Sequence, residues 1–343
     1  MDSPDRADFL KNLDSGGKYA GIVGLYRHNT SAHKIGVFDS EIISALAETG
    51  VKWIAHNGAG YDQIDISACI SKGELTVIST LSIIMFALGI KVSNTPGAVD
   101  DATATTALYL IISMLRQFSK AERNLRNGAW NRGLDSGRAL DLTGKTLAIL
   151  GMGGIGTRIA ELVHGFPMRV IYHNRRPAEG APSWTEYYPK EKLAEFLKEA
   201  DVLAVSVPLR QETVGLVGEV MIRGLKKGAF IVNTARGKVI NEEAIIRALE
   251  DGHVRLPDIA LSSSRSVDPY HLQLGGVGLD VYPNEPEVNP RLLEFDNVTL
   301  LPHMGTETRD SQKKMELRAL GNLKDFLVRG SGNDLIVEMR SRL

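Results

Sequence analysis

The sequence predicts an α/β protein made of two doubly wound units, and three observations support this prediction. The chain has 343 residues, which is enough for two separate cores. Short apolar runs alternate with helical patterns through its middle, as is typical of parallel βαβ units. A glycine-rich turn joins the first of these runs to a helical pattern.

The middle of the chain supplies the more regular unit, which we assign to residues 119–303. Strands are expected over 145–150, 169–172, 202–207, 230–233, 277–281 and 298–301, with helices over 154–163, 191–199, 220–225 and 241–250. Right-handed crossovers between parallel strands bring the loops after these strands to one edge of the sheet, where ligands bind.

The flanks predict a second α/β unit, assigned to residues 1–118 and 304–343. Strands are expected over 19–26 and 52–55, and helices over 39–48 and 102–118. A final helix over 310–328 is expected to return the chain to this unit. The cleft between the two units is the default binding site.

Composition and charge argue against several functions. A formal net charge of -1 without charged blocks argues against nucleic acid or a membrane surface as a partner. The apolar stretch 75–90 is shorter than the ~20 residues of a membrane span. Cys69 is the single cysteine, which fits a reducing, cytoplasmic location. The last residues, Ser341-Arg342-Leu343, resemble a peroxisomal address, which is the minor alternative.

The glycine-rich turn is a candidate dinucleotide site. Gly151 allows a tight turn, Gly153 lets backbone amides approach a pyrophosphate, and Gly156 permits close packing of helix on sheet. Gly154 and Ile155 complete the loop at the helix N-terminus, whose partial positive charge favours phosphate. A purely structural turn is the alternative.

The end of the next strand distinguishes NADP from NAD. An NAD enzyme carries an acidic residue there for the ribose hydroxyl, whereas this chain has Asn174, Arg175 and Arg176. Guanidinium groups can bind a 2'-phosphate, so we expect NADP(H) to be preferred and NAD(H) to remain usable. The alternative is that both arginines are ordinary surface charges.

Three segments near the ends of later strands then become recognisable. Residues 233–237 (NTARG), 278–286 (GLDVYPNEP) and 302–305 (PHMG) resemble the signatures of the D-isomer-specific 2-hydroxyacid dehydrogenases, and most of all the fungal glyoxylate/hydroxypyruvate reductases. The resemblance implies a Rossmann-type domain inserted into a flavodoxin-like substrate domain. It also implies a homodimer, and it requires no metal.

Reduction of a small 2-keto acid explains the catalytic residue types. Arg236 can bind the carboxylate and polarise the carbonyl, and His303 can protonate the alkoxide that a hydride leaves. Glu285 would orient the imidazole and favour its charged form. Taken singly, Arg236 could be an ion-pair partner, Glu285 a turn residue and His303 a surface histidine.

The resemblance implies further contacts. Asp280 would lie near the nicotinamide, and the backbone amides of Ala59 and Gly60 would receive the substrate carboxylate. Arg236 and His303 would contact both substrate and cofactor. The remaining cofactor contacts expected are Val207, Pro208, Thr213, Thr234, Ala235 and Gly305.

Two stretches and the start of the chain depart from the family pattern. Residues 74–89 and 255–274 lengthen connections that usually take about 2–6 residues, and we interpret both as retained introns. Genuine lineage-specific loops are the alternative. The substrate domain is expected to lack its first strand. Besides a reductase for small or bulkier 2-keto acids, a dinucleotide-sensing regulator and an inactive product of a mis-spliced gene remain open.

Overall fold

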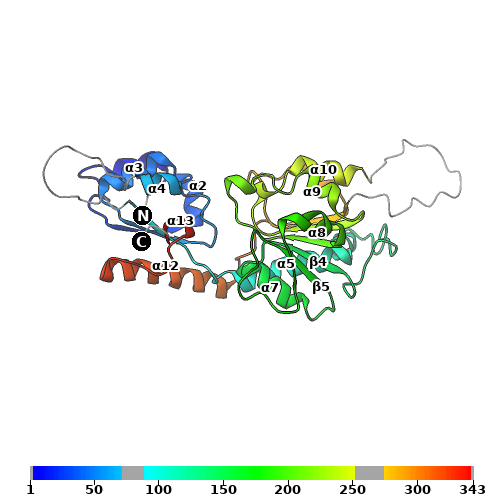
Figure 1. The fold of residues 1–343 in the computed structure, drawn as a ribbon. Helices are drawn as coiled ribbons and strands as arrows, with labels where there is room; N and C mark the ends of the chain where they lie inside the picture. Colours follow the sequence, from blue (N-terminus) through cyan, green and yellow to red (C-terminus); the bar gives the residue numbers. More distant parts are fainter. Residues whose placement is uncertain (1–2, 72–88, 252–273, 341–343) are drawn as a thin grey trace. The chain divides into compact units, whose positions relative to one another are not determined.

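The structure is a computed structural model, and it describes residues 3–71, 89–251 and 274–340. The chain divides into two compact units, Met1–Val99 with Thr308–Leu343, and Asp100–Glu307. The second unit is therefore inserted into the first (Figure 1). No described helix combines the length and the apolar composition that a bilayer crossing requires.

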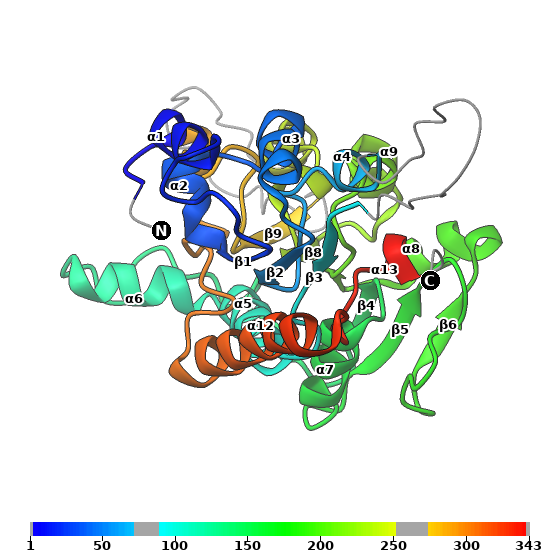
Figure 2. The same cartoon turned by 90° about the vertical axis from the view of Figure 1, so that its left-hand side faces the viewer.

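The first unit contains a three-stranded parallel sheet. Strands β1 (Gly24–His28), β2 (Trp53–Asn57) and β3 (Lys91–Ser93) lie in the order β1-β2-β3. Helix α12 (Arg309–Arg329) packs on one face, and α1 (Arg6–Leu13), α3 (Ser40–Thr49) and α4 (Ile66–Ser71) lie on the other, as Figure 2 shows. Its short elements are η1 (Asn29–Ser31), α2 (Ala32–Ile35) and α13 (Val337–Arg340).

The second unit contains a seven-stranded sheet in the order β10-β9-β8-β7-β4-β5-β6, with every neighbouring pair parallel. The strands are β4 (Thr146–Leu150), β5 (Arg169–His173), β6 (Glu186–Tyr188), β7 (Val202–Val205), β8 (Ala229–Asn233), β9 (Leu274–Leu279) and β10 (Val298–Leu300). The strand order reverses between β4 and β7, and sheets of this kind bind ligands at the carboxyl ends beside such a reversal.

Helices cover both faces of this sheet. Helices α5 (Asp100–Leu115) and α7 (Gly154–Val163) pack on one face, and α8 (Leu193–Glu199), α9 (Glu219–Gly224) and α10 (Glu242–Glu250) on the other. The remaining helical elements are α6 (Phe118–Arg126), η2 (Lys190–Lys192), η3 (Gln211–Thr213), η4 (Gly237–Val239) and α11 (Pro290–Leu293). Strands β4, β7 and β8 are buried throughout, as expected for a parallel sheet covered on both faces.

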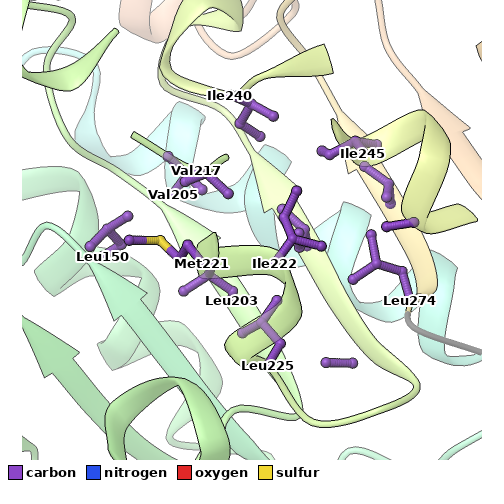
Figure 3. Packing of buried hydrophobic residues seen from close by; sticks show 14 of the residues in the cluster. Leu150, Leu203, Val205, Val217, Met221, Ile222, Leu225, Ile240, Ile245 and Leu274 are labelled. Atoms are coloured by element: carbon purple, nitrogen blue, oxygen red, sulfur yellow. The ribbon is translucent and has the colours of Figure 1, made fainter. Parts of the chain in front are cut away.

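The larger core of the second unit lies under α9 and α10. Figure 3 shows Leu203 and Val205 of β7 beside Met221, Ile222 and Leu225, which belong to α9 or directly follow it. These side chains are at most 7% exposed. The continuous packing fixes the loops that emerge from the carboxyl ends of the strands.

The predicted α/β class with parallel sheets is confirmed, while several predicted elements change. The expected strand over 19–26 is wrong in its first half, because Tyr19 to Gly21 form turns and β1 begins at Gly24. The expected helix over 102–118 ends at Leu115, and Gln117 adopts φ 54° before α6 begins. Strand β6 was not predicted, because it has three residues and only one neighbouring strand.

The unit boundaries also differ from those expected. Helix α5 belongs to the second unit, because it packs against α7 and against β8 and β9, whereas we assigned residues 1–118 to the first unit. Among the described residues, no strand precedes β1, and the N-terminal segment forms α1 with Phe9 and Leu13 buried. Apart from Gly89 and Leu274, the stretches 74–89 and 255–274 lie outside the described residues.

Candidate active site

The site residues predicted in the second unit follow the carboxyl ends of neighbouring strands. Gly151 follows β4, Val207 lies just beyond β7, Thr234 follows β8, Asp280 follows β9 and His303 lies just beyond β10. Because all these strands are parallel, the five segments leave the same edge of the sheet.

His303 and Glu285 form the central contact of this edge. The imidazole Nδ1 lies 2.7 Å from Glu285 Oε2, and the N–H of Tyr282 donates to Glu285 Oε1 at 2.9 Å. The two side chains are 43% and 35% exposed. The Nε2 of His303 makes no hydrogen bond to any described residue, which leaves it available to a reacting group.

The charge state of Glu285 follows from opposing effects. Burial raises the pKa of Glu285. The hydrogen bonds from His303 and from the Tyr282 N–H, together with the charges of His303 and Arg236, lower the pKa by more than burial raises it. The net pKa lies below the ordinary value, so Glu285 is a carboxylate at neutral pH. The charge of Arg236 is thus one of the influences that keep Glu285 ionised.

Arg236 is held in position by its backbone. The side chain of Asn233 accepts from the N–H of Ala235 at 3.0 Å and donates to the carbonyl of Arg236 at 2.9 Å. A Cβ on Gly237 would lie 1.9 Å from the carbonyl carbon of Tyr282, so only glycine allows the two backbones to meet this closely. The Arg236 loop is thereby pressed against the loop that carries Glu285.

Asp280 holds the backbone after His303. Its two carboxylate oxygens accept from the N–H groups of Met304 at 2.6 Å and Gly305 at 2.8 Å, and its carbonyl accepts from the N–H of His303 at 2.8 Å. His303 has φ 56°, an uncommon conformation that these bonds stabilise. Burial raises the pKa of Asp280, and the two N–H groups and the charge of His303 oppose that rise only in part.

The glycine loop combines two close backbone contacts with one open position. Gly151 has φ 104°, and a Cβ there would lie 2.7 Å from the carbonyl oxygen of Ser206. A Cβ on Gly156 would lie 2.3 Å from the carbonyl oxygen of Gly151. A Cβ on Gly153 would meet no atom within 4 Å, and this residue caps α7 without a side-chain bond to the helix. The space at Gly153 can therefore receive an anion, whereas the carboxylate of Asp100 lies against Gly154, where a Cβ would be 2.2 Å from its oxygen.

The end of β5 combines a structural residue with two exposed cations. The side-chain oxygen of Asn174 accepts from the N–H of Met152 at 2.7 Å and so supports the glycine loop. Arg175 and Arg176 are exposed and form no ion pair with any described residue. Their guanidinium groups are free to bind an anionic ligand.

The other predicted cofactor residues lie on the same edge with different surroundings. The Thr213 hydroxyl donates to the carbonyl of Pro208 at 2.7 Å and shapes the loop after β7. The side chain of Thr234 is buried, whereas Val207 and Ala235 are partly exposed and Gly305 is buried. Among the described residues, no group of three or more His, Cys, Asp or Glu could hold a metal ion.

Ala59 and Gly60 lie in the first unit, after the carboxyl end of β2. The carbonyl of Ala59 accepts from Asn94 Nδ2 at 2.8 Å, and the carbonyl of Gly60 lies 2.8 Å from His56 Nε2. The N–H groups of Ala59 and Gly60 donate to no other described residue. Backbone N–H groups left open in this way can bind a carboxylate.

Asn233 and Tyr282 lie within the recognisable sequence motifs, but the sequence indicated no role for either residue. The Tyr282 hydroxyl donates to the carbonyl of Leu301 at 2.9 Å, so this residue ties the loop after β9 to the end of β10. Their side chains bond to backbone groups, that of Asn233 within its own loop and that of Tyr282 at the end of β10. Because every residue carries backbone groups, bonds to them cannot be predicted from the spacing of residue types.

Comparison with known proteins agrees with this geometry. The family described as D-isomer specific 2-hydroxyacid dehydrogenase, NAD binding domain, matches residues 108–258. The chain is 38% identical to 4-methyl-2-oxopentanoate reductase A of Aspergillus oryzae over 343 residues, 99% of this chain and 90% of that protein.

Solved structures give the same result. A glyoxylate reductase from Paecilomyes thermophila superposes with a TM-score of 0.83 at 38% identity, covering 98% of this chain and 90% of that one. An NADPH-dependent glyoxylate/hydroxypyruvate reductase from Sinorhizobium meliloti, solved with NADP and malonate, gives 0.75 at 27% identity, covering 95% and 88%. The chain therefore belongs to the D-isomer specific 2-hydroxyacid dehydrogenases, which are NAD(P)-dependent oxidoreductases.

Proposed function

We propose that this chain reduces glyoxylate and hydroxypyruvate to the corresponding D-2-hydroxy acids with NADPH. The observation that carries the proposal is the His303–Glu285 contact of 2.7 Å, with the charge of Arg236 acting on Glu285, at the edge of the sheet that also presents the glycine loop. This set supplies an acid, a group that orients it and a cation for the substrate.

The substrate is bound and polarised by groups of matching charge. Arg236 presents a planar guanidinium that can hold the carboxylate and withdraw electron density from the neighbouring carbonyl. The open N–H groups of Ala59 and Gly60 receive the carboxylate as well. Both kinds of contact favour an anionic 2-keto acid over a neutral ketone.

His303 delivers the proton that completes the reduction. The dinucleotide, when bound, supplies a hydride to the carbonyl carbon, and the π electrons move to the oxygen. His303 Nε2 donates its proton to that oxygen, while Nδ1 stays bonded to the ionised Glu285, which stabilises the charged imidazole beforehand. Solvent then restores the proton.

The dinucleotide is proposed to bind along the same edge. Its pyrophosphate fits the space at Gly153, and its 2'-phosphate would be bound by Arg175 and Arg176. The likeness to a reductase solved with NADP supports this choice. The remaining contacts are proposed at Gly151, Gly154, Ile155, Gly156, Asn174, Val207, Pro208, Thr213, Thr234, Ala235, Arg236, Asp280, His303 and Gly305.

A reductase for bulkier 2-keto acids is the second candidate. A relative that is 38% identical over nearly the whole chain is named for 4-methyl-2-oxopentanoate. The two candidates use the same catalytic set and differ only in the side chain that the substrate pocket accepts. The ratio of kcat/KM for glyoxylate and 4-methyl-2-oxopentanoate distinguishes them.

We also propose that two copies of this chain form a homodimer. Helix α6 has no buried residue, and Phe118, Leu125 and Trp130 are 47%, 58% and 72% exposed. A second copy that covers these side chains would remove apolar surface from water. We expect sedimentation velocity to give twice the 37.4 kDa mass of one chain. A monomer at micromolar concentration would contradict the proposal.

The activity itself is tested by NADPH oxidation. We expect turnover with glyoxylate and hydroxypyruvate, and a loss of about 10²–10⁴-fold in kcat for His303→Asn, which removes the acid. Asparagine tolerates the left-handed backbone at this position, so the variant should fold and bind NADPH. No turnover by the wild-type protein with any 2-keto acid, despite tight NADPH binding, would instead support a regulator.

Cofactor preference is tested at the end of β5. Arg175→Ala with Arg176→Ala removes two charge-assisted bonds to the 2'-phosphate, so the Kd for NADPH should rise by roughly 10- to 100-fold. The Kd for NADH should change little, as measured by nicotinamide fluorescence. Lys198→Ala removes an exposed cation from α8 and is the matched control. Equal weakening of both cofactors would refute the phosphate role.

The charge on Glu285 is tested through the pH dependence of kcat. The carboxyl group has a lowered pKa, so its negative charge is present at neutral pH and is lost as the pH falls through that pKa. Glu285→Gln keeps an acceptor but removes the charge. We expect the wild-type kcat to fall on the acid side as Glu285 is protonated, and the variant to be slower at neutral pH and to lack that acid limb. An acid limb that persists unchanged in the variant would show that Glu285 acts through orientation alone.

A further inference from the structure

Each carbonyl of the segment Gly58, Ala59 and Gly60 is bonded to a different group of the first unit. Gly58 accepts from the N–H of Thr95 at 3.1 Å, Ala59 from Asn94 Nδ2 at 2.8 Å, and Gly60 lies 2.8 Å from His56 Nε2. In a planar trans peptide the C=O and the following N–H point in opposite directions. The three bonds therefore fix both the path of the loop and the direction of its N–H groups.

His56 is fully buried, and its ring is bonded at both nitrogens. A carbonyl oxygen can only accept, so the Nε2 that faces Gly60 carries the proton. Nδ1 lies 3.1 Å from a guanidinium nitrogen of Arg27 and accepts from it. The arginine excludes the other neutral tautomer, which would present a bare nitrogen to the Gly60 carbonyl.

Arg27 is an unusual group to find in this position. It is 1% exposed, it donates to Gln63 Oε1 at 2.8 Å, and it lies over the ring of Phe38 at 4.9 Å. Burial lowers the pKa of Arg27 to about 10 against the opposing charge of Asp62, so it remains a cation at neutral pH. Its Nε has no hydrogen-bond partner among the described residues.

Stability alone is a poor reason to keep such a cation. Desolvation of a buried charge is costly, and apolar replacements of similar volume are often neutral or stabilising. The charge does, however, polarise the imidazole and strengthen the bond that His56 donates to Gly60. The burial of Arg27 is therefore better explained by its effect, through His56, on the conformation of the loop 58–60.

We propose that Arg27 and His56 are positioning residues, which lock the loop so that the N–H groups of Ala59 and Gly60 are aimed at the substrate carboxylate. The proposal rests on the 2-keto acid reductase function given above. Arg27 acts through His56, and neither side chain is required to touch the substrate. Losing the lock should weaken substrate binding much more than it slows the chemical step.

Two substitutions of His56 separate the two bonds of its ring. In His56→Gln the side-chain amide reaches the place of Nε2 and can still donate to Gly60. In His56→Asn the shorter amide reaches only the place of Nδ1, so it can accept from Arg27 but leaves Gly60 without its donor. Arg27→Met removes the cation at similar length. Tyr19→Phe, which removes a buried hydroxyl bond to Ser3 in the same core, is the control.

We expect His56→Asn and Arg27→Met to raise the KM for glyoxylate roughly tenfold, the effect of about one hydrogen bond, with kcat changed by less than about threefold. His56→Gln and Tyr19→Phe should keep a KM near that of the wild type. Thermal melting and the Kd for NADPH report whether each variant is folded. If folded His56→Asn has the wild-type KM, or folded His56→Gln is equally impaired, the positioning role is wrong.

A second readout does not depend on turnover. In the NADP-loaded protein, the amide resonances of Ala59 and Gly60 should shift when oxamate, a non-reacting carboxylate, is added. The shifts should be preserved in His56→Gln and strongly reduced in His56→Asn. If the wild-type amides shift but no 2-keto acid is reduced, the proposed function fails and the loop proposal stands. If they do not shift, the loop proposal fails whatever the turnover.

Discussion

The close approach of Gly237 to the backbone of Tyr282 and Pro283 is the constraint on which the catalytic edge depends. No side chain fits between them, because a Cβ on Gly237 would lie within 2.4 Å of the Tyr282 carbonyl and the Pro283 nitrogen. The contact brings the segment after β8 against the segment after β9. Arg236 is the residue before this glycine, and Glu285 follows three residues after Tyr282, so both charges reach the site from one backbone contact. Parallel strands provide the common edge, and this contact brings the loops together.

The two carboxyl groups near His303, those of Asp280 and Glu285, lie in different environments and have different roles. Asp280 is buried and uses both oxygens on backbone N–H groups, and its pKa is raised. Glu285 is more exposed, contacts the imidazole, and has a lowered pKa. The first therefore shapes the backbone, whereas the second holds the imidazole of His303. Such a separation of pKa values between neighbouring carboxyl groups is the usual sign that their roles differ.

The sequence was informative where a signal is local. Apolar runs predicted the central strands, and the glycine spacing predicted the turn at Gly151, whose φ of 104° and close contact with Ser206 explain why glycine is needed there. Motif resemblance identified Arg236, Glu285 and His303, which the structure places at one edge. It did not indicate that Asn174 supports the glycine loop, nor any role for Arg27. Their partners are backbone atoms or buried groups 22 to 29 residues away, and only the folded chain defines them.

Both units rely on the same device, which is a buried polar side chain that satisfies peptide groups and so fixes a functional loop. Asn233 does this for the backbone around Arg236, and Asn94 with His56 does it for the carbonyls of Ala59 and Gly60. An apolar residue at any of these positions would leave a backbone group without its partner, which costs about 1–3 kcal/mol when buried. Because any other loop conformation would incur this penalty, each loop is held in one conformation. In the proposed function, the groups that bind the substrate are therefore positioned mainly by other side chains of the same unit.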